Sequence, residues 1–281
     1  MGTLVERDTI ALDAAHLPTR APLTVVIPTL NEAAQIGELV ATLDWADEVI
    51  VADGGSTDAT VAIARGAGAT VIEHAGEGGG ETIAAQRNQG ITLARNEWVF
   101  ALDSDERIPE ALQLELRRVV AAPAHPAYRV RRRSFFLGRE RRRGRWGRDW
   151  QVRLFTRERQ FLPARVHERL EPVRDLGTLH GALRHTPYRS LRHQLDKMLA
   201  YAEWGAQDLH ARGRRAALWE LGARPLWRFF RDYCLYGSWL DGPVPAIVCF
   251  AGLILILVVV GMGKFLAPTP DTTAVQATRL D

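Results

Sequence analysis

Cysteine is scarce in this 281-residue chain, which has only Cys234 and Cys249. Two cysteines are too few for a disulfide framework or a cysteine-based zinc site. The first twenty residues lack a continuous apolar run, so no secretory signal is visible and the cytosolic side is the expected compartment. A hydrophobic fraction of 47% and a charged fraction of 25% exclude a disordered tail protein, a collagen-like chain and a multi-span transporter.

Lysine is almost missing, because Lys197 and Lys264 leave 34 of the 36 basic residues as arginine. Genome base composition explains this bias as well as function does. Ten of the arginines fall between Arg129 and Arg148. They form either a solvated basic loop or a surface for anionic lipid headgroups or an anionic acceptor, since guanidinium suits phosphate and carboxylate partners. No RNA-binding motif accompanies them, so no nucleic acid partner is expected.

Short apolar segments alternate with amphipathic ones from Leu23 to about Asp105. The predicted strands cover residues 23–27, 48–52, 69–73 and 97–102. The predicted helices are one capped by Asn31, one from a Ser56 cap to about Arg65, one over about 81–95, and one started by Pro109. This alternation predicts an α/β fold, with a Rossmann-like, mostly parallel sheet covered by helices on both faces.

Polar side chains follow three of these predicted strands. Thr29 and Asn31 come after the first, Asp53 after the second, and Asp103 and Asp105 after the fourth. This edge is the ligand crevice of open α/β sheets. Helix capping and turn formation are local alternatives for Asn31 and Asp53. Because three strand ends carry such groups, the sequence favours a binding site.

The triplet Asp103-Ser104-Asp105 places two carboxylates in a turn directly after a strand. Such a pair can bind Mg²⁺ or Mn²⁺, which prefer oxygen ligands and often share them with substrate phosphates. The cation would screen negative charge on a diphosphate leaving group. Solvated acidic turns are common, and it is the position after a buried strand that favours a metal site.

The alternation stops beyond Pro123. Strands are predicted over 128–133 and 149–156, and a helical region begins near Ser190. Tryptophans and arginines mix in the last third, as at a membrane interface. The 22 uncharged residues between Asp241 and Lys264 would form a helix of about 33 Å, close to the thickness of a bilayer core. We expect this segment to span or re-enter the membrane; a buried core helix is the alternative.

Three motifs, in this order and spacing, resemble glycosyltransferase family 2. They are Val26-Ile-Pro-Thr-Leu-Asn-Glu32, Val51-Ala-Asp-Gly-Gly-Ser-Thr-Asp58 and Leu102-Asp-Ser-Asp-Glu106. The resemblance covers about residues 23–170. It implies a GT-A fold, a UDP-sugar or similar donor, a divalent metal (Mg²⁺ or Mn²⁺), and inversion of the anomeric centre by direct displacement.

The same resemblance implies roles for single residues. Asp105, with Asp103, would bind the metal, and Asp103 would also face the ribose or sugar. The implied nucleotide-sugar site consists of Pro28, Thr29, Asn31, Glu32, Asp53, Gln86, Arg87, Asn88, Asp103 and Ser104.

Further motifs are similar to those of bacterial lipopolysaccharide-core glucosyltransferases. They are Gln86-Arg-Asn88, Gln151-Val-Arg-Leu-Phe155, Val166-His-Glu168 and the run from Arg224 to Gly242. The similarity implies transfer of glucose from UDP-glucose to a lipid-linked anionic saccharide at the cytosolic face of the inner membrane. Glu168 is the expected general base. His167 is an alternative base, a metal ligand or a group that orients Glu168.

Four residues are expected to contact the acceptor or the diphosphate: Gln151, Arg153, Arg131 and Arg132. For the first two, the alternation in residues 151–155 is also what a half-buried strand shows. Two other functions stay open. A polyprenyl-phosphate glycosyltransferase would need the same anchor and metal but no strong base, and a non-catalytic membrane-tethered protein would bind anionic lipid or RNA.

The expected organisation has five segments. They are an N-terminal extension (1–21), a GT-A domain (22–185), a helical, interface-associated region (186–242), a hydrophobic membrane segment (243–264) and a tail (265–281).

Overall fold

The structure is a computed structural model. It describes residues 20–73, 82–136, 138–143, 146–163, 168–188 and 229–241, with positions 190, 192, 194, 199, 223 and 226–227. The chain divides into two compact units, one with residues 1–133 and 149–185 and the other with residues 134–148 and 186–281. His167 and the predicted membrane segment lie outside the described residues. Within the described part, no helix combines the length and the apolar character needed to cross a bilayer.

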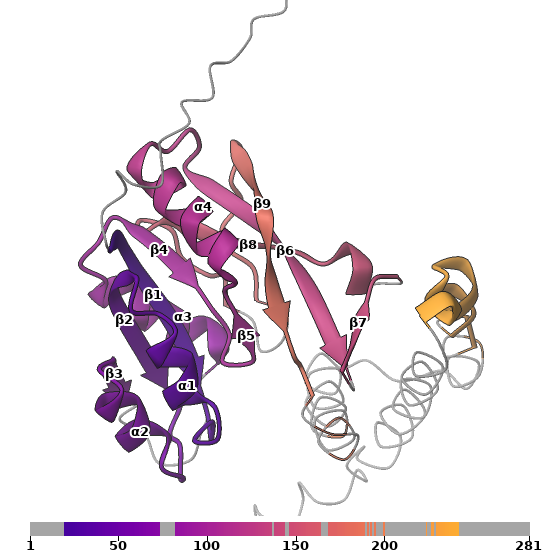
Figure 1. Ribbon diagram of the computed structural model, residues 1–281, viewed down its shortest axis with the longest axis horizontal. Coiled ribbons are helices and arrows are strands. Elements are labelled where there is room, and N and C mark those ends of the chain that lie inside the picture. The colour runs from indigo at the N-terminus through magenta and orange to yellow at the C-terminus, as the bar shows by residue number, and fades with distance from the viewer. Residues whose placement is uncertain are drawn as a thin grey trace, which may run out of the picture. The chain divides into compact units, whose positions relative to one another are not determined.

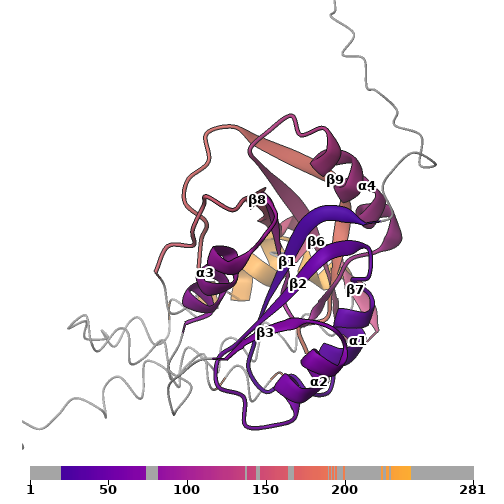
Figure 2. The same cartoon turned by 90° about the vertical axis from the view of Figure 1, so that its left-hand side faces the viewer.

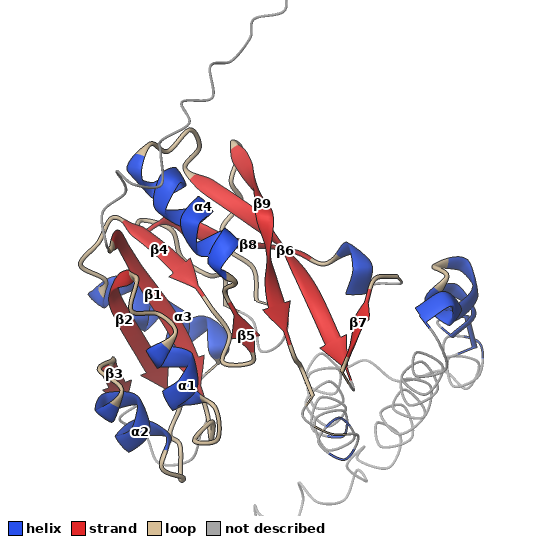
Figure 3. Ribbon diagram, in the orientation of Figure 1, coloured by secondary structure: helices blue, strands red, loops and turns tan. Residues whose placement is uncertain are grey.

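The helices and strands are drawn in Figure 1 and coloured by type in Figure 3. The strands are β1 (Ala21–Thr29), β2 (Ala46–Asp53), β3 (Thr70–Glu73), β4 (Trp98–Ala101), β5 (Glu106–Arg107), β6 (Ala127–Phe136), β7 (Arg139–Arg141), β8 (Trp150–Thr156) and β9 (Leu176–His185). The α-helices are α1 (Ile36–Ala41), α2 (Thr60–Gly66), α3 (Ile83–Leu93) and α4 (Glu110–Ala121). Each strand and helix predicted before residue 123 is present, with boundaries shifted by a few residues.

The strands form one mixed sheet in the order β3-β2-β1-β4-β8-β6-β9-β5, with β7 paired to β6. β1 to β4 are parallel, as predicted, but β8 runs antiparallel to both β4 and β6. The expectation of a mostly parallel sheet is therefore wrong for its second half. The reason is connectivity: the described residues between β6 and β8 form no α-helix, and a parallel pair would need such a crossover.

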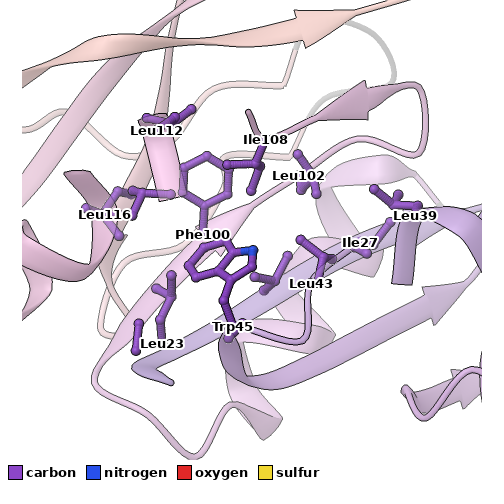
Figure 4. Packing of buried hydrophobic residues seen from close by; sticks show 14 of the residues in the cluster. Leu23, Ile27, Leu39, Leu43, Trp45, Phe100, Leu102, Ile108, Leu112 and Leu116 are labelled. Atoms are coloured by element: carbon purple, nitrogen blue, oxygen red, sulfur yellow. The ribbon is translucent and has the colours of Figure 1, made fainter. Parts of the chain in front are cut away.

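Helices cover both faces of the parallel half, as predicted. Figure 2 shows α3 on one side of β1 and β2, with α1, α2 and α4 on the other. Successive side chains of β1 alternate between the two cores: Val25 and Ile27 pack toward one, and Val26 packs toward the other. Figure 4 shows the larger core, in which Phe100 of β4 lies among leucines of α4 and neighbouring strands. The two cores hold the strand ends in fixed register.

Two predicted helix caps are wrong. Asn31 has a positive φ of 57°, and its Oδ1 accepts a hydrogen bond of 2.8 Å from the backbone N–H of Thr57. The Ser56 hydroxyl accepts from the backbone N–H of Asn31 at 2.8 Å. The helices begin later, α1 after Gln35 and α2 after Ala59. Both polar side chains instead tie the loop after β1 to the loop after β2.

The second unit contains β7 and short helical turns, a π-helical segment over Phe230–Leu235 and a 3-10 turn over Ser238–Asp241. The Asp241 carboxylate accepts hydrogen bonds from the backbone N–H groups of Arg142 and Arg143, at 3.1 and 3.0 Å. The Arg141 guanidinium donates to the carbonyl oxygen of Asp241 at 3.0 Å. These contacts fix the 3-10 turn to the end of β7.

Candidate active site

The carboxyl ends of β1 and β2 meet at Thr29 and Asp53, which are partners in the strand register. Asp53 is almost fully buried, and its carboxylate accepts hydrogen bonds from the hydroxyls of Thr29 (3.1 Å) and Ser56 (2.5 Å). It also accepts from the backbone N–H groups of Gly55 and Ser56. Asp53 therefore orders the turn that follows β2, in agreement with the turn alternative, and places that turn at the edge predicted for the nucleoside.

Gln86 of α3 packs closely under this turn. A Cβ on Gly54 would lie 2.0 Å from Nε2 of Gln86, so a larger residue at that position would displace the Gln86 amide. Across the edge, the Ser104 hydroxyl donates to Oε1 of Glu32 at 3.0 Å and links the loop after β4 to the loop after β1. Pro28 lies in β1 opposite Ala52. The structure thus brings the nucleotide-site candidates of three strand ends to one edge of the sheet.

Asp103 lies at the centre of a group of charged side chains, which we call the Asp103 cluster. Its members are Asp103, Glu106, Arg87, Arg132, Arg153 and Glu168. Arg87 from α3 and Arg153 from β8 both pair with the Asp103 carboxylate. One Arg153 nitrogen also donates to Oε1 of Glu106 at 2.8 Å. Glu106 Oε2 in turn accepts from the backbone N–H of Asp103 at 3.0 Å.

Burial and pairing act oppositely on the two carboxylates of the cluster. Burial would raise the pKa of Asp103, but the guanidinium groups of Arg153 and Arg87 outweigh it and hold that pKa far below its usual value. Glu106 is fully buried, and burial raises its pKa above the usual value despite Arg153. For Arg153, burial opposes the charged form, yet Asp103 and Glu106 raise its pKa. Asp103 and Arg153 are therefore a charged pair.

The four residues predicted to contact the acceptor or the diphosphate lie in different surroundings in the structure. Arg153 and Arg132 join the Asp103 cluster, where an Arg132 nitrogen lies 3.3 Å from Oε1 of Glu106. Burial alone would lower the pKa of Arg132, but Glu106 and Asp149 raise it. Gln151 donates to Oδ1 of Asp149 at 2.6 Å, next to the cluster. Arg131 is exposed, because side chains alternate along β6 and its neighbour Arg132 takes the inner side.

Glu168 lies in the loop between Phe161 and Leu170, which pair as an isolated β-bridge. Its Oε1 accepts a hydrogen bond from the Arg87 guanidinium at 2.7 Å, and its side chain is 15% exposed. Asn88 does not face the cluster: its side chain donates to the carbonyl of Phe161 (2.9 Å) and accepts from the N–H of Phe161 (2.8 Å). The predicted base is thus brought to Asp103 from 65 positions away in the sequence.

Asp105 points to a different partner. β5 pairs antiparallel with β9, which sets His185 opposite Glu106. As a result, Nε2 of His185 lies 3.5 Å from Oδ1 of Asp105. An oxygen donor from the turn before β5 and a nitrogen donor from the end of β9 suit Mn²⁺ or Mg²⁺, the nitrogen favouring the former. Within the described residues, no group of three or more His, Cys, Asp or Glu side chains forms a complete cage for a metal.

Sequence reasoning assigned no role to two residues of this site, Glu106 and His185. Glu106 is the last residue of the acidic motif Leu102-Asp-Ser-Asp-Glu106, so the motif itself could have drawn attention to it. The structure shows that it is a fully buried partner of arginines. His185 ends β9, a strand that was not predicted, and its proximity to Asp105 depends on its pairing with Glu106, 79 positions away. Local sequence patterns carry no signal for such a pair.

Comparison with known proteins identifies the family. A family model described as Glycosyl transferase family 2 matches residues 24–186. The lipopolysaccharide core biosynthesis glycosyltransferase LpsC of Rhizobium meliloti (strain 1021) is 29% identical over 238 residues, covering 79% of this chain and 84% of LpsC. An uncharacterized glycosyltransferase of Rickettsia typhi (strain ATCC VR-144 / Wilmington) is 26% identical over 245 residues, covering 80% and 82%.

Two solved structures of low sequence identity are also matched. TarS 1–349 of S. aureus is matched with a TM-score of 0.46 and 16% identity, over 86% of this chain and 91% of that one. Glucosyl-3-phosphoglycerate synthase from Mycobacterium tuberculosis, in complex with Mn²⁺, UDP and glucosyl-3-phosphoglycerate, is matched with a TM-score of 0.33 and 24% identity, over 42% and 45%. The family model covers more than half of the sequence, and the chain belongs to glycosyltransferase family 2.

Proposed function

We propose that this glycosyltransferase is an inverting, metal-dependent hexosyltransferase that moves a hexose, with UDP-glucose as the expected donor, onto a lipopolysaccharide-core acceptor. One observation carries the proposal: in a family 2 chain, Asp103 and Glu168 share the guanidinium of Arg87, and Asp105 lies in the same turn as Asp103, against His185. The description of the Rhizobium relative as a lipopolysaccharide core biosynthesis enzyme supports the acceptor class.

Glu168 acts as the general base in this proposal. Its carboxylate takes the proton of the acceptor hydroxyl while that oxygen forms a bond to the anomeric carbon. The bond from the anomeric carbon to the diphosphate oxygen breaks at the same time, and the diphosphate leaves with its electron pair. Attack from the side opposite the leaving group inverts the anomeric centre. Arg153 and Arg87 pair with Asp103 at this edge and offset its negative charge, which would otherwise repel an anionic donor.

Asp105 and His185 are the residues that would hold the divalent cation. Both oxygens of Asp103 are already paired with arginines, so the geometry favours Asp105 over Asp103 as a ligand. A bound Mg²⁺ or Mn²⁺ would supply charge neutralisation at the leaving diphosphate. The remaining ligands would come from the diphosphate and water, as is usual for these ions.

Membrane attachment at the cytosolic face belongs to the same proposal. Half of the exposed large apolar side chains among the described residues lie within residues 226–240; they are Leu226, Trp227, Phe230, Leu235, Tyr236, Trp239 and Leu240. The same unit exposes Arg139, Arg142, Arg143 and Arg148. Aromatic and aliphatic side chains beside arginines suit the headgroup region of an anionic membrane, and the uncharged segment 242–263 follows directly.

A donor screen tests the proposal. The full-length protein is incubated with UDP-sugars, Mg²⁺ or Mn²⁺, and purified lipopolysaccharide-core acceptors, and the linkage of the product is determined. We expect hexose transfer that stops when EDTA removes the metal and that is absent in Asp105→Ala. The absence of both UDP release and hexose transfer with every donor, with and without metal, would contradict the proposal and favour a non-catalytic lipid-binding protein.

One substitution, Glu168→Gln, distinguishes a sugar acceptor from a polyprenyl-phosphate acceptor. A phosphate acceptor is already ionised and needs no strong base, whereas a sugar hydroxyl does. Under our proposal, Glu168→Gln lowers kcat by about 10²- to 10⁴-fold, the usual contribution of a general base. Near-normal turnover in Glu168→Gln, together with an inactive Asp105→Ala, would favour the polyprenyl-phosphate acceptor.

A further inference from the structure

Two consecutive residues of α3 hold the loop that carries Glu168. Asn88 makes two hydrogen bonds to the backbone of Phe161, at 2.9 and 2.8 Å, at the start of this loop. The Arg87 guanidinium carbon lies 4.7 Å from the centre of the Phe161 ring. The same guanidinium donates to Glu168 at the other end of the loop. Both ends of the loop are thus attached to one rigid helix.

Arg87 also reaches the donor side of the site. One of its terminal nitrogens bonds to Glu168, and the other bonds to Asp103. The side chain is only 3% exposed, and the ring of Phe161 restricts the plane of the guanidinium. A planar fork with two fixed donors sets the separation of two carboxylates in a way that a lysine ammonium cannot.

We propose that Arg87 is a positioning residue, which holds the base Glu168 at a fixed distance from Asp103, with Asn88 securing the loop. This inference rests on the proposed role of Glu168 as general base. Arg87 itself transfers no proton and contacts the acceptor only through Glu168. Without the bridge, Glu168 stays attached to its loop but is no longer held at Asp103.

The variant Arg87→Lys tests this role because it keeps the charge and removes the bridge. We expect kcat to fall by about 100-fold, the effect of misplacing a reacting group by about 1 Å. The KM for the sugar nucleotide and the Kd for UDP with Mn²⁺, measured by calorimetry, should stay within about threefold, since the donor site is intact. Arg95→Lys is the matched control: Arg95 pairs with Glu48 at 2.9 Å, but it is exposed and lies outside the cluster.

A double-mutant cycle shows whether Arg87 acts through Glu168. Glu168→Asp shortens the base, and adding Arg87→Lys to it should lower kcat by much less than Arg87→Lys does alone. Asn88→Ala is a second test, because it loosens the loop without removing a contact of Asp103. It should lower kcat and leave the Kd for UDP unchanged. In the Glu168→Asp background, the same substitution should lower kcat by much less. If Arg87→Lys does not fold, the Asn88→Ala cycle decides.

Two results would overturn the inference. The first is a raised Kd for UDP with unchanged kcat in Arg87→Lys, which would make Arg87 a donor-binding residue. The second is full multiplication of the kcat losses in both cycles. Failure of the proposed function would give a different result: the unmodified protein itself would then neither bind UDP nor transfer a hexose.

Discussion

At the scale of single residues, the site depends on carboxylates and arginines that the chain brings together from distant positions. Arg153 shares its charge between Asp103 and Glu106, and Glu106 is fully enclosed. An enclosed carboxylate is tolerated only when partners compensate for its lost hydration. Glu106 is thus a structural counter-ion, which keeps Arg153 and Arg132 beside Asp103.

Removing this counter-ion should cost stability. We expect Glu106→Ala to lower the free energy of unfolding by about 3–5 kcal/mol, since it removes a fully buried carboxylate that pairs with both Arg153 and Arg132. The measurement is urea unfolding followed by tryptophan fluorescence. Glu73→Ala is the control, because Glu73 pairs with Arg65 on the surface with both side chains 54% exposed, and such pairs contribute about 1 kcal/mol or less. Equal losses in the two variants would show that the buried cluster does not stabilise the fold.

The candidate residues of the site could be named from the sequence, but their partners could not. Asp103, Arg87, Arg153 and Glu168 stand in recognisable motifs. That Arg87 pairs with residues 16 and 81 positions away follows only from the packing of α3 against the sheet. Sequence reasoning therefore expected these arginines to face the nucleotide or diphosphate, whereas the structure shows them bound to the site's own acids.

At the scale of elements, hydrophobic periodicity predicted the parallel half of the sheet because each strand and helix there carries its pattern within a few residues. β9 was missed because glycines interrupt its pattern. Gly177 is required by a contact that is invisible in the sequence, as a Cβ there would lie 2.3 Å from the ring of Tyr128. The antiparallel half depends on such contacts between strands, and local patterns do not record them.

The packing of α3 on β1 gives a testable consequence. A Cβ on Gly90 would lie 2.4 Å from Cγ1 of Val26, so the helix lies as close to the sheet as glycine permits. We expect Gly90→Ala to lower the free energy of unfolding by about 1–3 kcal/mol through overpacking. It should also lower kcat, because α3 carries Arg87.

Gly66 at the end of α2 offers the matched control, since no atom lies within 4 Å of a Cβ placed there. Gly66→Ala should change the free energy of unfolding by less than about 1 kcal/mol, in either direction. Urea unfolding and steady-state kinetics on both variants check the expectation. Unchanged stability in Gly90→Ala would mean that α3 can move away from β1 at little cost.

At the scale of the whole molecule, the two units differ in what they expose. The unit with the Asp103 cluster has two buried cores and only scattered exposed apolar side chains, whereas residues 226–240 of the other unit present seven aromatic and aliphatic side chains to solvent within fifteen positions. The proposed membrane surface therefore belongs to one unit, and the chemistry of sugar transfer belongs to the other. This division allows membrane binding and catalysis to be altered separately.

Vesicle binding by the full-length protein tests that division. We expect Arg139→Gln combined with Arg143→Gln to weaken binding to anionic vesicles by about tenfold or more, at about 1 kcal/mol per basic residue near the surface. Transfer to a detergent-dispersed acceptor should be unchanged. Arg65→Gln combined with Arg95→Gln, two exposed arginines of the other unit, is the control. Equal weakening by both pairs would show that charge alone, and not this surface, attracts the vesicles.

The position of β8 between β4 and β6 has a consequence for synthesis on the ribosome. β4 is complete at Ala101, but its outer neighbour in the sheet begins only at Trp150. During that interval the nascent chain carries an open strand edge with Val99 and Phe100, which is a template for pairing with other chains. We expect copies released before residue 156 to aggregate, and protection by chaperones to matter most over this stretch of translation.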